Sequence, residues 1–209
     1  MNSSTETTTP SLIGVSGRRR SGKDTFAGHL IEKFDFQRVA FADLLRNTLL
    51  DTDPYVSSPH GDTELLSVLL AECGGWEGLK NNPDWSGDTR RLMQNLGVSV
   101  RNNIGSSTWV DAAMAHISKI CDAGGRVVVT DMRFPNEVES IRAAGGLIVR
   151  INRPSLRLDT GSALDLHVSE ALLDDPELLR PNLTLESDPF DTFPARAISA
   201  LAGVSFTRR

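Results

Sequence analysis

The sequence has only two cysteines, Cys73 and Cys121, in 209 residues. Two cysteines form no disulfide framework, which favours a reducing compartment, so we expect the cytoplasm. No apolar run approaches the ~20 residues that a membrane-spanning helix needs, so we expect no membrane association. The first residues lack both the basic start and the apolar stretch of a secretory signal, so none is expected.

An excess of basic charge is also missing. The 22 basic residues are outnumbered by 27 acidic ones, giving a formal net charge of −5. That balance argues against a protein that coats nucleic acid, and we expect no nucleic-acid partner. The basic residues are 18 Arg and only 4 Lys. Arg binds phosphate oxygens through two parallel hydrogen bonds, although a GC-rich genome explains the same bias equally well.

The apolar fraction and the alternation of elements predict one folded α/β domain. Apolar residues make up 39% of the chain and 17 glycines add to them, which is ordinary for a globular protein. We predict a disordered lead-in over 1–10 and one domain over 11–209, with a mostly helical insertion over about 51–123. Strands alternate with helices, which predicts a parallel, doubly wound sheet. The predicted strands are 12–16, 37–42, 126–131, 146–151 and 182–186, and the predicted helices are 23–34, 43–50, 63–72, 89–102, 107–123, 136–144, 168–173 and 193–202. Sheet strands are not expected over 51–88.

A glycine-rich loop follows the first predicted strand. Gly17, Gly22 and Lys23 have the GxxxxGK spacing of a phosphate-binding loop. Such a loop turns successive main-chain N–H groups inward, and the helix that follows presents its positive N-terminal end. The residue after the lysine is usually Ser or Thr, but here Asp24 precedes Thr25. Either of these two residues is a candidate to serve Mg²⁺, directly or through water, and the sequence leaves the choice open.

A second polar group begins where the predicted strand 126–131 ends. Asp131, Arg133 and Glu137 lie in the segment TDMRFPNE. In open α/β sheets ligands bind outside the carboxyl ends of the strands, so these residues are expected at the same edge as the glycine-rich loop. The alternative is a strand-end cap with one surface ion pair.

Two further groups give weaker signals. Arg90, Gln94 and Arg101 share one face of a predicted helix, a pattern that is usually just a solvated surface. His167 and Glu170 lie one turn apart, which is more typical of a helix start than of a catalytic pair. No Cys/His set has metal-ligand spacing, and no Ser/His/Asp group stands out.

Taken together, these stretches resemble the deoxynucleoside monophosphate kinases of bacteriophages. The matching segments are GRRRSGKDT, the run RRLMQNLG with the later TWVD, TDMRFPNE, IVRINRP and HVSE, and they extend with gaps over about residues 11–200. The order of the segments makes the match specific, and the family shares the GKDT sequence at Asp24. The resemblance implies a P-loop kinase fold, which is a parallel β-sheet core flanked by helices with an NMP-binding segment and a lid over about 152–170.

The resemblance also implies a reaction and a set of site residues. The reaction is ATP + dNMP giving ADP + dNDP with Mg²⁺, a part of deoxynucleotide biosynthesis. Enzymes of this size and kind are often homodimers. Carried over by position, the ATP-binding residues are Gly17, Arg20, Ser21, Gly22, Lys23, Asp24 and Thr25, with Arg153 and Arg157 in the lid segment, where the alignment is poor. The dNMP-binding residues are Arg19, Arg101, Gly105, Trp109, Asp131, Arg133 and Glu137.

The expected mechanism is electrostatic, because two anionic phosphates must be brought in line. Lys23 and Arg19 are expected to hold the transferring group with Mg²⁺, while Arg133 and Arg101 orient the acceptor. Asp131 is a candidate for the sugar 3′-hydroxyl or for a magnesium-bound water. Two alternatives remain: a P-loop kinase with another acceptor, such as dephospho-CoA or a ribonucleoside monophosphate, and a non-catalytic nucleotide-binding regulator.

Overall fold

The computed structural model describes residues 10–18, 20–155, 176–189 and 192–202. Within it the chain divides into two compact units, one formed by residues 1–40 and 113–209 and the other by residues 41–112. Several predictions lie outside the described residues: the lead-in over 1–9, the helix near 168–173, most of the lid segment, and the side chains of Arg19 and Arg157.

The first unit is built on a five-stranded sheet. Its strands are β1 (Leu12–Ser16), β2 (Phe36–Val39), β5 (Arg126–Val129), β6 (Leu147–Asn152) and β7 (Leu183–Glu186). They are ordered β2-β5-β1-β6-β7, and every pairing between them is parallel. This confirms the predicted parallel sheet. β1 is the central strand and is buried along its whole length, as its unbroken apolar run requires.

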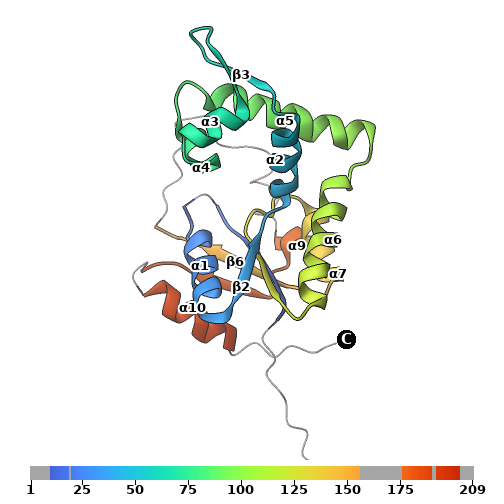
Figure 1. The fold of residues 1–209 in the computed structure, drawn as a ribbon. Helices are drawn as coiled ribbons and strands as arrows, with labels where there is room; N and C mark the ends of the chain where they lie inside the picture. Colours follow the sequence, from blue (N-terminus) through green and yellow to red (C-terminus); the bar gives the residue numbers. More distant parts are fainter. Residues whose placement is uncertain (1–9, 19, 156–175, 190–191, 203–209) are drawn as a thin grey trace, which may run out of the picture. The chain divides into compact units, whose positions relative to one another are not determined.

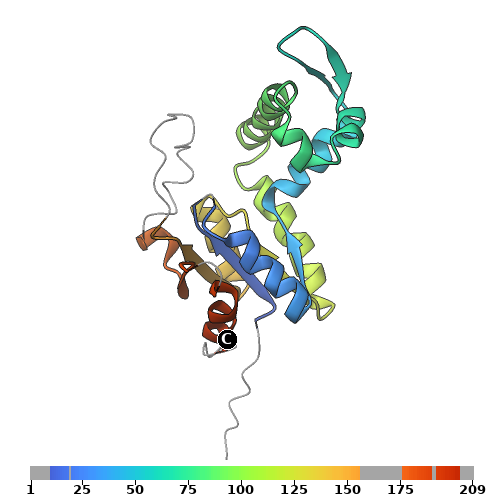
Figure 2. The same ribbon diagram turned by 90° about the vertical axis from the view of Figure 1, so that its left-hand side faces the viewer.

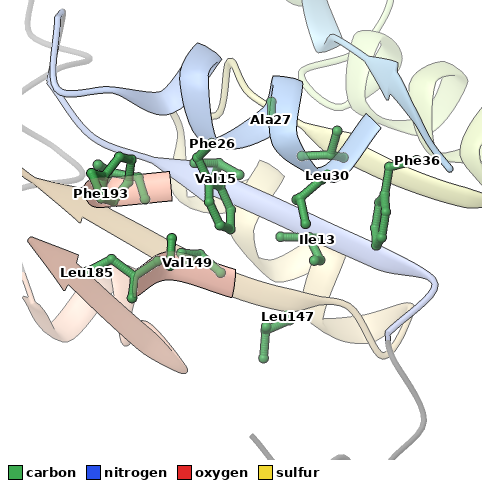
Figure 3. Packing of buried hydrophobic residues seen from close by; sticks show 13 residues of the cluster. Ile13, Val15, Phe26, Ala27, Leu30, Phe36, Leu147, Val149, Leu185 and Phe193 are labelled. Atoms are coloured by element: carbon green, nitrogen blue, oxygen red, sulfur yellow. The ribbon is translucent and has the colours of Figure 1, made fainter. Parts of the chain in front are cut away.

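Helices cover both faces of this sheet. α1 (Lys23–Phe34) and α10 (Phe193–Ala202) pack on one face (Figure 1), where Val15, Phe26 and Phe193 belong to one buried cluster (Figure 3). α7 (Pro135–Ala143) covers the other face. There Gly14 of β1 lies so close to α7 that a Cβ would stand 2.8 Å from Ile141 Cδ1. The same unit contains the short α9 (Pro176–Leu179) and most of α6 (Thr108–Asp122).

The second unit is mainly helical and has a core of its own. It contains α2 (Phe41–Thr52), α3 (Leu66–Glu72), α4 (Trp76–Asn81) and α5 (Ser86–Asn103). Leu49, Val56, Leu66, Leu69 and Leu79 form its buried cluster, and Trp76 and Trp85 pack against that cluster.

The prediction that residues 51–88 contain no sheet strands is wrong. β3 (Tyr55–Ser57) and β4 (Thr63–Leu65) form an antiparallel hairpin, which stands out at the end of this unit in Figure 2. A turn closes it, in which Ser58 donates its main-chain N–H to the Asp62 carbonyl over 2.8 Å. The ladder takes the first three residues of the predicted helix 63–72, so α3 begins at Leu66. Three-residue strands are too short to show an alternating pattern, so these two strands could not be predicted from periodicity.

Candidate functional site

The loop between β1 and α1 has a backbone that requires glycine at both ends of its motif. A Cβ on Gly17 would stand 2.5 Å from Ser21 Oγ and 2.6 Å from the main-chain oxygen of Ile151. Gly22 caps α1 with φ 102°, a left-handed conformation that side chains disfavour. The two glycines of the predicted motif are therefore explained by the shape of the loop itself.

Lys23 is folded back over this loop. Its Nζ donates to the main-chain oxygens of Gly17 over 2.6 Å and of Arg18 over 2.7 Å. The ammonium group is thus fixed at the start of α1, where the helix dipole adds positive potential. An anion that enters the loop can compete with these two carbonyl oxygens for the ammonium group.

Ser21 supplies the observation that tests whether the loop fits a phosphate. This residue is 2% exposed, and its Oγ is a buried polar atom with no hydrogen-bond partner in the described part of the chain. A buried hydroxyl without a partner costs free energy, and phosphate oxygens are strong acceptors for it. The unpartnered hydroxyl, the glycine backbone and the lysine together fit a bound phosphate chain.

Asp24 and Thr25 occupy the first turn of α1, so both predicted metal candidates adjoin the loop. The Asp24 side chain is exposed, and Thr25 is half-buried. An oxygen ligand of Mg²⁺ can come from either side chain. Among the described residues, no group of three or more His, Cys, Asp or Glu side chains could hold a metal ion by itself.

The second predicted group lies at the end of the strand beside β1. β5 pairs in parallel with β1, so Asp131 and Arg133, which follow it, leave the sheet at the same edge as the loop. Asp131 is half-buried and the Arg133 side chain is exposed. The prediction that these strand ends share an edge is confirmed by the pairing.

Glu137 binds the main chain of the turn between β5 and α7. It is 4% exposed, and its Oε2 accepts hydrogen bonds from the main-chain N–H groups of Arg133 over 2.6 Å and Phe134 over 3.0 Å. A carboxylate at the N-terminus of α7 also suits the helix dipole. Glu137 therefore fixes the main chain from which the Arg133 side chain extends.

Arg153 follows β6 and contacts the loop from the other side of β1. Its Nη1 donates to the main-chain oxygen of Arg20 over 3.3 Å. Its Nε lies 3.4 Å from Oδ1 of Asp188. The predicted ATP-binding residues Arg20 and Arg153 are thus brought together.

Three predicted substrate-binding residues belong to the second unit. Arg101 is in the last turn of α5, Gly105 follows that helix, and Trp109 is in the first turn of α6. Trp109 is 7% exposed, and its indole N–H donates to the Gly97 carbonyl over 3.2 Å. The Thr108 hydroxyl donates to the Gly105 carbonyl. Arg101 and Gly105 are half-buried, and the predicted contact of these three residues with dNMP stays a prediction.

Sequence reasoning missed Arg150 of β6. This strand pairs Arg150 with Ser16, the last residue of β1, and the Arg150 Nη1 donates to Ser16 Oγ over 3.2 Å. A cation therefore lies directly before the glycine-rich loop. An arginine inside the apolar run LIVRIN was the available signal, because a charged residue in a buried strand needs a specific partner.

Shifted pKa values occur at four described positions, which are Asp88, Arg91, Cys121 and Asp188. Hydrogen bonds from the main chain and hydroxyl of Ser155 lower the pKa of Asp188. A hydrogen bond from Arg91 lowers the pKa of Asp88, beside a shallow surface pocket of about 320 Å³ in the second unit. Burial raises the pKa of the Cys121 thiol. Only Asp188 lies near the glycine-rich loop, through its contact with Arg153.

Comparison with known proteins gives consistent family assignments. A family model described as deoxynucleotide monophosphate kinase matches residues 77–177. A protein of Acanthamoeba polyphaga mimivirus with the provisional name deoxynucleotide monophosphate kinase is 29% identical over 180 residues, covering 78% of this chain and 81% of the relative. The deoxynucleotide monophosphate kinase of Enterobacteria phage T4 is 30% identical over 93 residues, covering 44% of this chain and 36% of the relative. The chain is therefore similar in sequence to proteins named deoxynucleotide monophosphate kinase. The predicted resemblance is therefore confirmed.

A solved structure supports the fold. The dephospho-CoA kinase from Campylobacter jejuni superposes with a TM-score of 0.55 at 12% identity, covering 93% of this chain and 97% of that chain. At that identity the likeness concerns the fold alone. The chain has a P-loop kinase fold and, with its kinase relatives, is a phosphotransferase. Among the described residues, no helix combines the length and apolar character needed to cross a membrane.

Proposed function

We propose that this chain transfers the γ-phosphoryl group of ATP to a deoxynucleoside monophosphate, giving ADP and a deoxynucleoside diphosphate, with Mg²⁺. One observation carries the proposal. The glycine-rich loop follows β1, and a second set of charged residues follows β5, the neighbouring parallel strand, at the same edge of the sheet. A site for two anions side by side is what phosphoryl transfer requires. The deoxynucleotide relatives support the choice of acceptor.

The donor side of the proposed site is the glycine-rich loop. Main-chain N–H groups of the loop and the Ser21 hydroxyl would bind the phosphate chain of ATP, and Lys23 would neutralise its outer charge. To do so, the Lys23 ammonium would exchange its carbonyl partners for phosphate oxygens. Magnesium held at Asp24 or Thr25 would supply further charge neutralisation when bound.

The acceptor side of the proposed site uses the residues after β5. Arg133 would orient the monophosphate, with its main chain fixed by Glu137. Arg101 and the loop residue Arg19 are further candidate cations for that phosphate, and Asp131 is a candidate for the sugar 3′-hydroxyl. An acceptor phosphate oxygen then attacks the γ-phosphorus of ATP. The bond between the γ-phosphorus and the oxygen that links it to the β-phosphate breaks, and that oxygen leaves with ADP, so no covalent enzyme intermediate is needed.

An ADP-release assay with a panel of acceptors tests the proposal. Mg-ATP is combined in turn with each of the four common dNMPs, with AMP and CMP, and with dephospho-CoA. We expect ADP release that depends on a dNMP. Release only with dephospho-CoA or a ribonucleotide would identify another acceptor, and nucleotide binding without any acceptor-dependent release would indicate a non-catalytic regulator. Either result would overturn the proposal.

A pair of lysine variants on one helix links that activity to the loop. Lys23→Ala removes the ammonium that contacts Gly17 and Arg18, and we expect turnover to fall by about 100-fold or more. Lys33→Ala, at the exposed end of the same helix, is the matched control and should keep wild-type turnover. Near-normal turnover of Lys23→Ala would contradict the assigned role.

A further inference from the structure

The loop after β7 holds a carboxylate against the segment that leaves β6. Ser187, which follows β7, is fully buried and donates its main-chain N–H to the Asn152 carbonyl of β6 over 2.8 Å. Asp188 and Arg153 come directly after these residues. The two strand ends therefore present an acidic and a basic side chain to each other at the edge where the glycine-rich loop lies.

Asp188 is bound on both its main chain and its side chain. Arg196 of α10 donates from Nη2 to the main-chain oxygens of Asp188, over 2.8 Å, and Pro189, over 3.2 Å. The Asp188 carboxylate accepts from the Ser155 main-chain N–H over 2.7 Å and from its hydroxyl over 2.8 Å. A carboxylate held in this way is a fixed negative charge, and its lowered pKa fits that role.

Arg153 joins this carboxylate to the glycine-rich loop. Its Nε is buried and lies 3.4 Å from Asp188 Oδ1, and its Nη1 reaches the main-chain oxygen of Arg20. Arg20 has a left-handed backbone with φ 63° and lies directly before Ser21. Because a long arginine side chain has many rotamers, a fixed ion-pair partner is what limits it to the rotamer that contacts the loop.

We propose that Asp188 is a positioning residue of the nucleotide site, which holds the Arg153 guanidinium against the main chain of Arg20 and thereby fixes the loop that binds the ATP phosphates. The inference rests on the proposed function. Asp188 acts through Arg153 and need not touch the nucleotide. Its loss should weaken ATP binding while leaving the acceptor site unchanged.

Replacing Asp188 by Asn distinguishes a role in holding Arg153 from a role in binding Ser155 alone. Asp188→Asn keeps a carbonyl oxygen that can accept from Ser155 but loses the charge that attracts Arg153. We expect the KM for ATP to rise about tenfold through the loss of this ion pair, with the KM for dNMP unchanged. Asp122→Asn, at the exposed end of α6, is the control and should match the wild type.

A double-mutant cycle completes the test. If Asp188 acts through Arg153, then Arg153→Gln raises the KM for ATP, and the variant carrying both substitutions is no worse than the poorer single variant. Additive effects, or an unchanged KM for ATP in Asp188→Asn, would overturn the inference. A wild type with no acceptor-dependent ADP release would instead overturn the proposed function, so the two failures are distinguishable. Thermal unfolding of Asp188→Asn close to that of the wild type excludes general destabilisation as the cause.

Discussion

Gly17→Ala is the substitution whose effect follows most directly from the loop. The added Cβ would stand 2.5 Å from Ser21 Oγ and 2.6 Å from the main-chain oxygen of Ile151. The hydroxyl can rotate away, but the carbonyl belongs to β6, which pairs with strands on both sides. The loop must therefore move outward, and that movement separates Lys23 Nζ from the Gly17 carbonyl.

The magnitude follows from the cost of overpacking. Forcing an extra methyl group into a close-packed site costs about 1–3 kcal/mol, which for a chain of this size lowers Tm by about 2–12 °C. We also expect Mg-ATP to bind at least about tenfold more weakly, because the loop amides and Ser21 no longer point to one place. Scanning calorimetry measures the first effect, and titration calorimetry with Mg-ATP measures the second.

Gly28→Ala is the matched control. Gly28 lies in α1, eleven residues after Gly17, and a Cβ there would meet no atom within 4 Å. Replacing a helical glycine by alanine should keep or raise Tm, by up to ~1 kcal/mol of added stability, and leave Mg-ATP binding unchanged. The steric reasoning is refuted if Gly17→Ala unfolds at the wild-type temperature and binds Mg-ATP with the wild-type Kd.

Three further predictions concern single contacts. Glu137→Gln removes the charge that binds two main-chain N–H groups and should lower the free energy of unfolding, measured in urea, by about 1.5–3 kcal/mol. Glu139→Gln, on the exposed side of α7, is the control and should have little effect. Equal effects of the two substitutions would contradict the role of Glu137 in holding the main chain of Arg133 and Phe134. Trp109→Phe removes the hydrogen bond to the Gly97 carbonyl and should cost about 1 kcal/mol in the same measurement, so an unchanged value would mean that the bond contributes nothing. Asp88 has a pKa below its ordinary 3.8 because Arg91 donates a hydrogen bond to it, so its stabilisation is present above pH 3.8 and is lost as the pH falls through the lowered pKa. Asp88→Asn should therefore be less stable than the wild type at pH 7, and urea titrations should show the difference shrinking below pH 3.8; a difference that grows in acid would reverse the sign of the argument.

The parts of the fold that follow local rules were predictable from the sequence. β1, the glycine-rich loop and α1 could be predicted because an apolar run, two glycines and helical spacing each act within a few residues. Because parallel strands end at the same edge of a sheet, it was also predictable that the segments after β1 and β5 lie at one edge. The β3–β4 hairpin could not be predicted, because its strands are only three residues long and its turn depends on the contacts of Ser58 with Asp62.

The parts of the site that depend on tertiary contacts could not be predicted. Arg153 and Asp188 are 35 residues apart, and only the pairing of β6 with β7 brings them together. Glu137 was correctly placed at the site edge, but no spacing rule shows that its carboxylate turns back to the N–H groups of Arg133 and Phe134. The same is true of Trp109, whose indole N–H pairs with a carbonyl twelve residues earlier.

A crystal structure with magnesium and a non-hydrolysable ATP analogue would show whether the glycine-rich loop binds the phosphates of ATP. We expect the phosphate chain of the analogue inside the loop from Gly17 to Gly22. The Ser21 hydroxyl should donate to a phosphate oxygen, and Lys23 Nζ should turn from the carbonyls of Gly17 and Arg18 toward the outer phosphates. An analogue bound elsewhere, with Lys23 still on those carbonyls and the Ser21 hydroxyl still without a partner, would contradict this expectation.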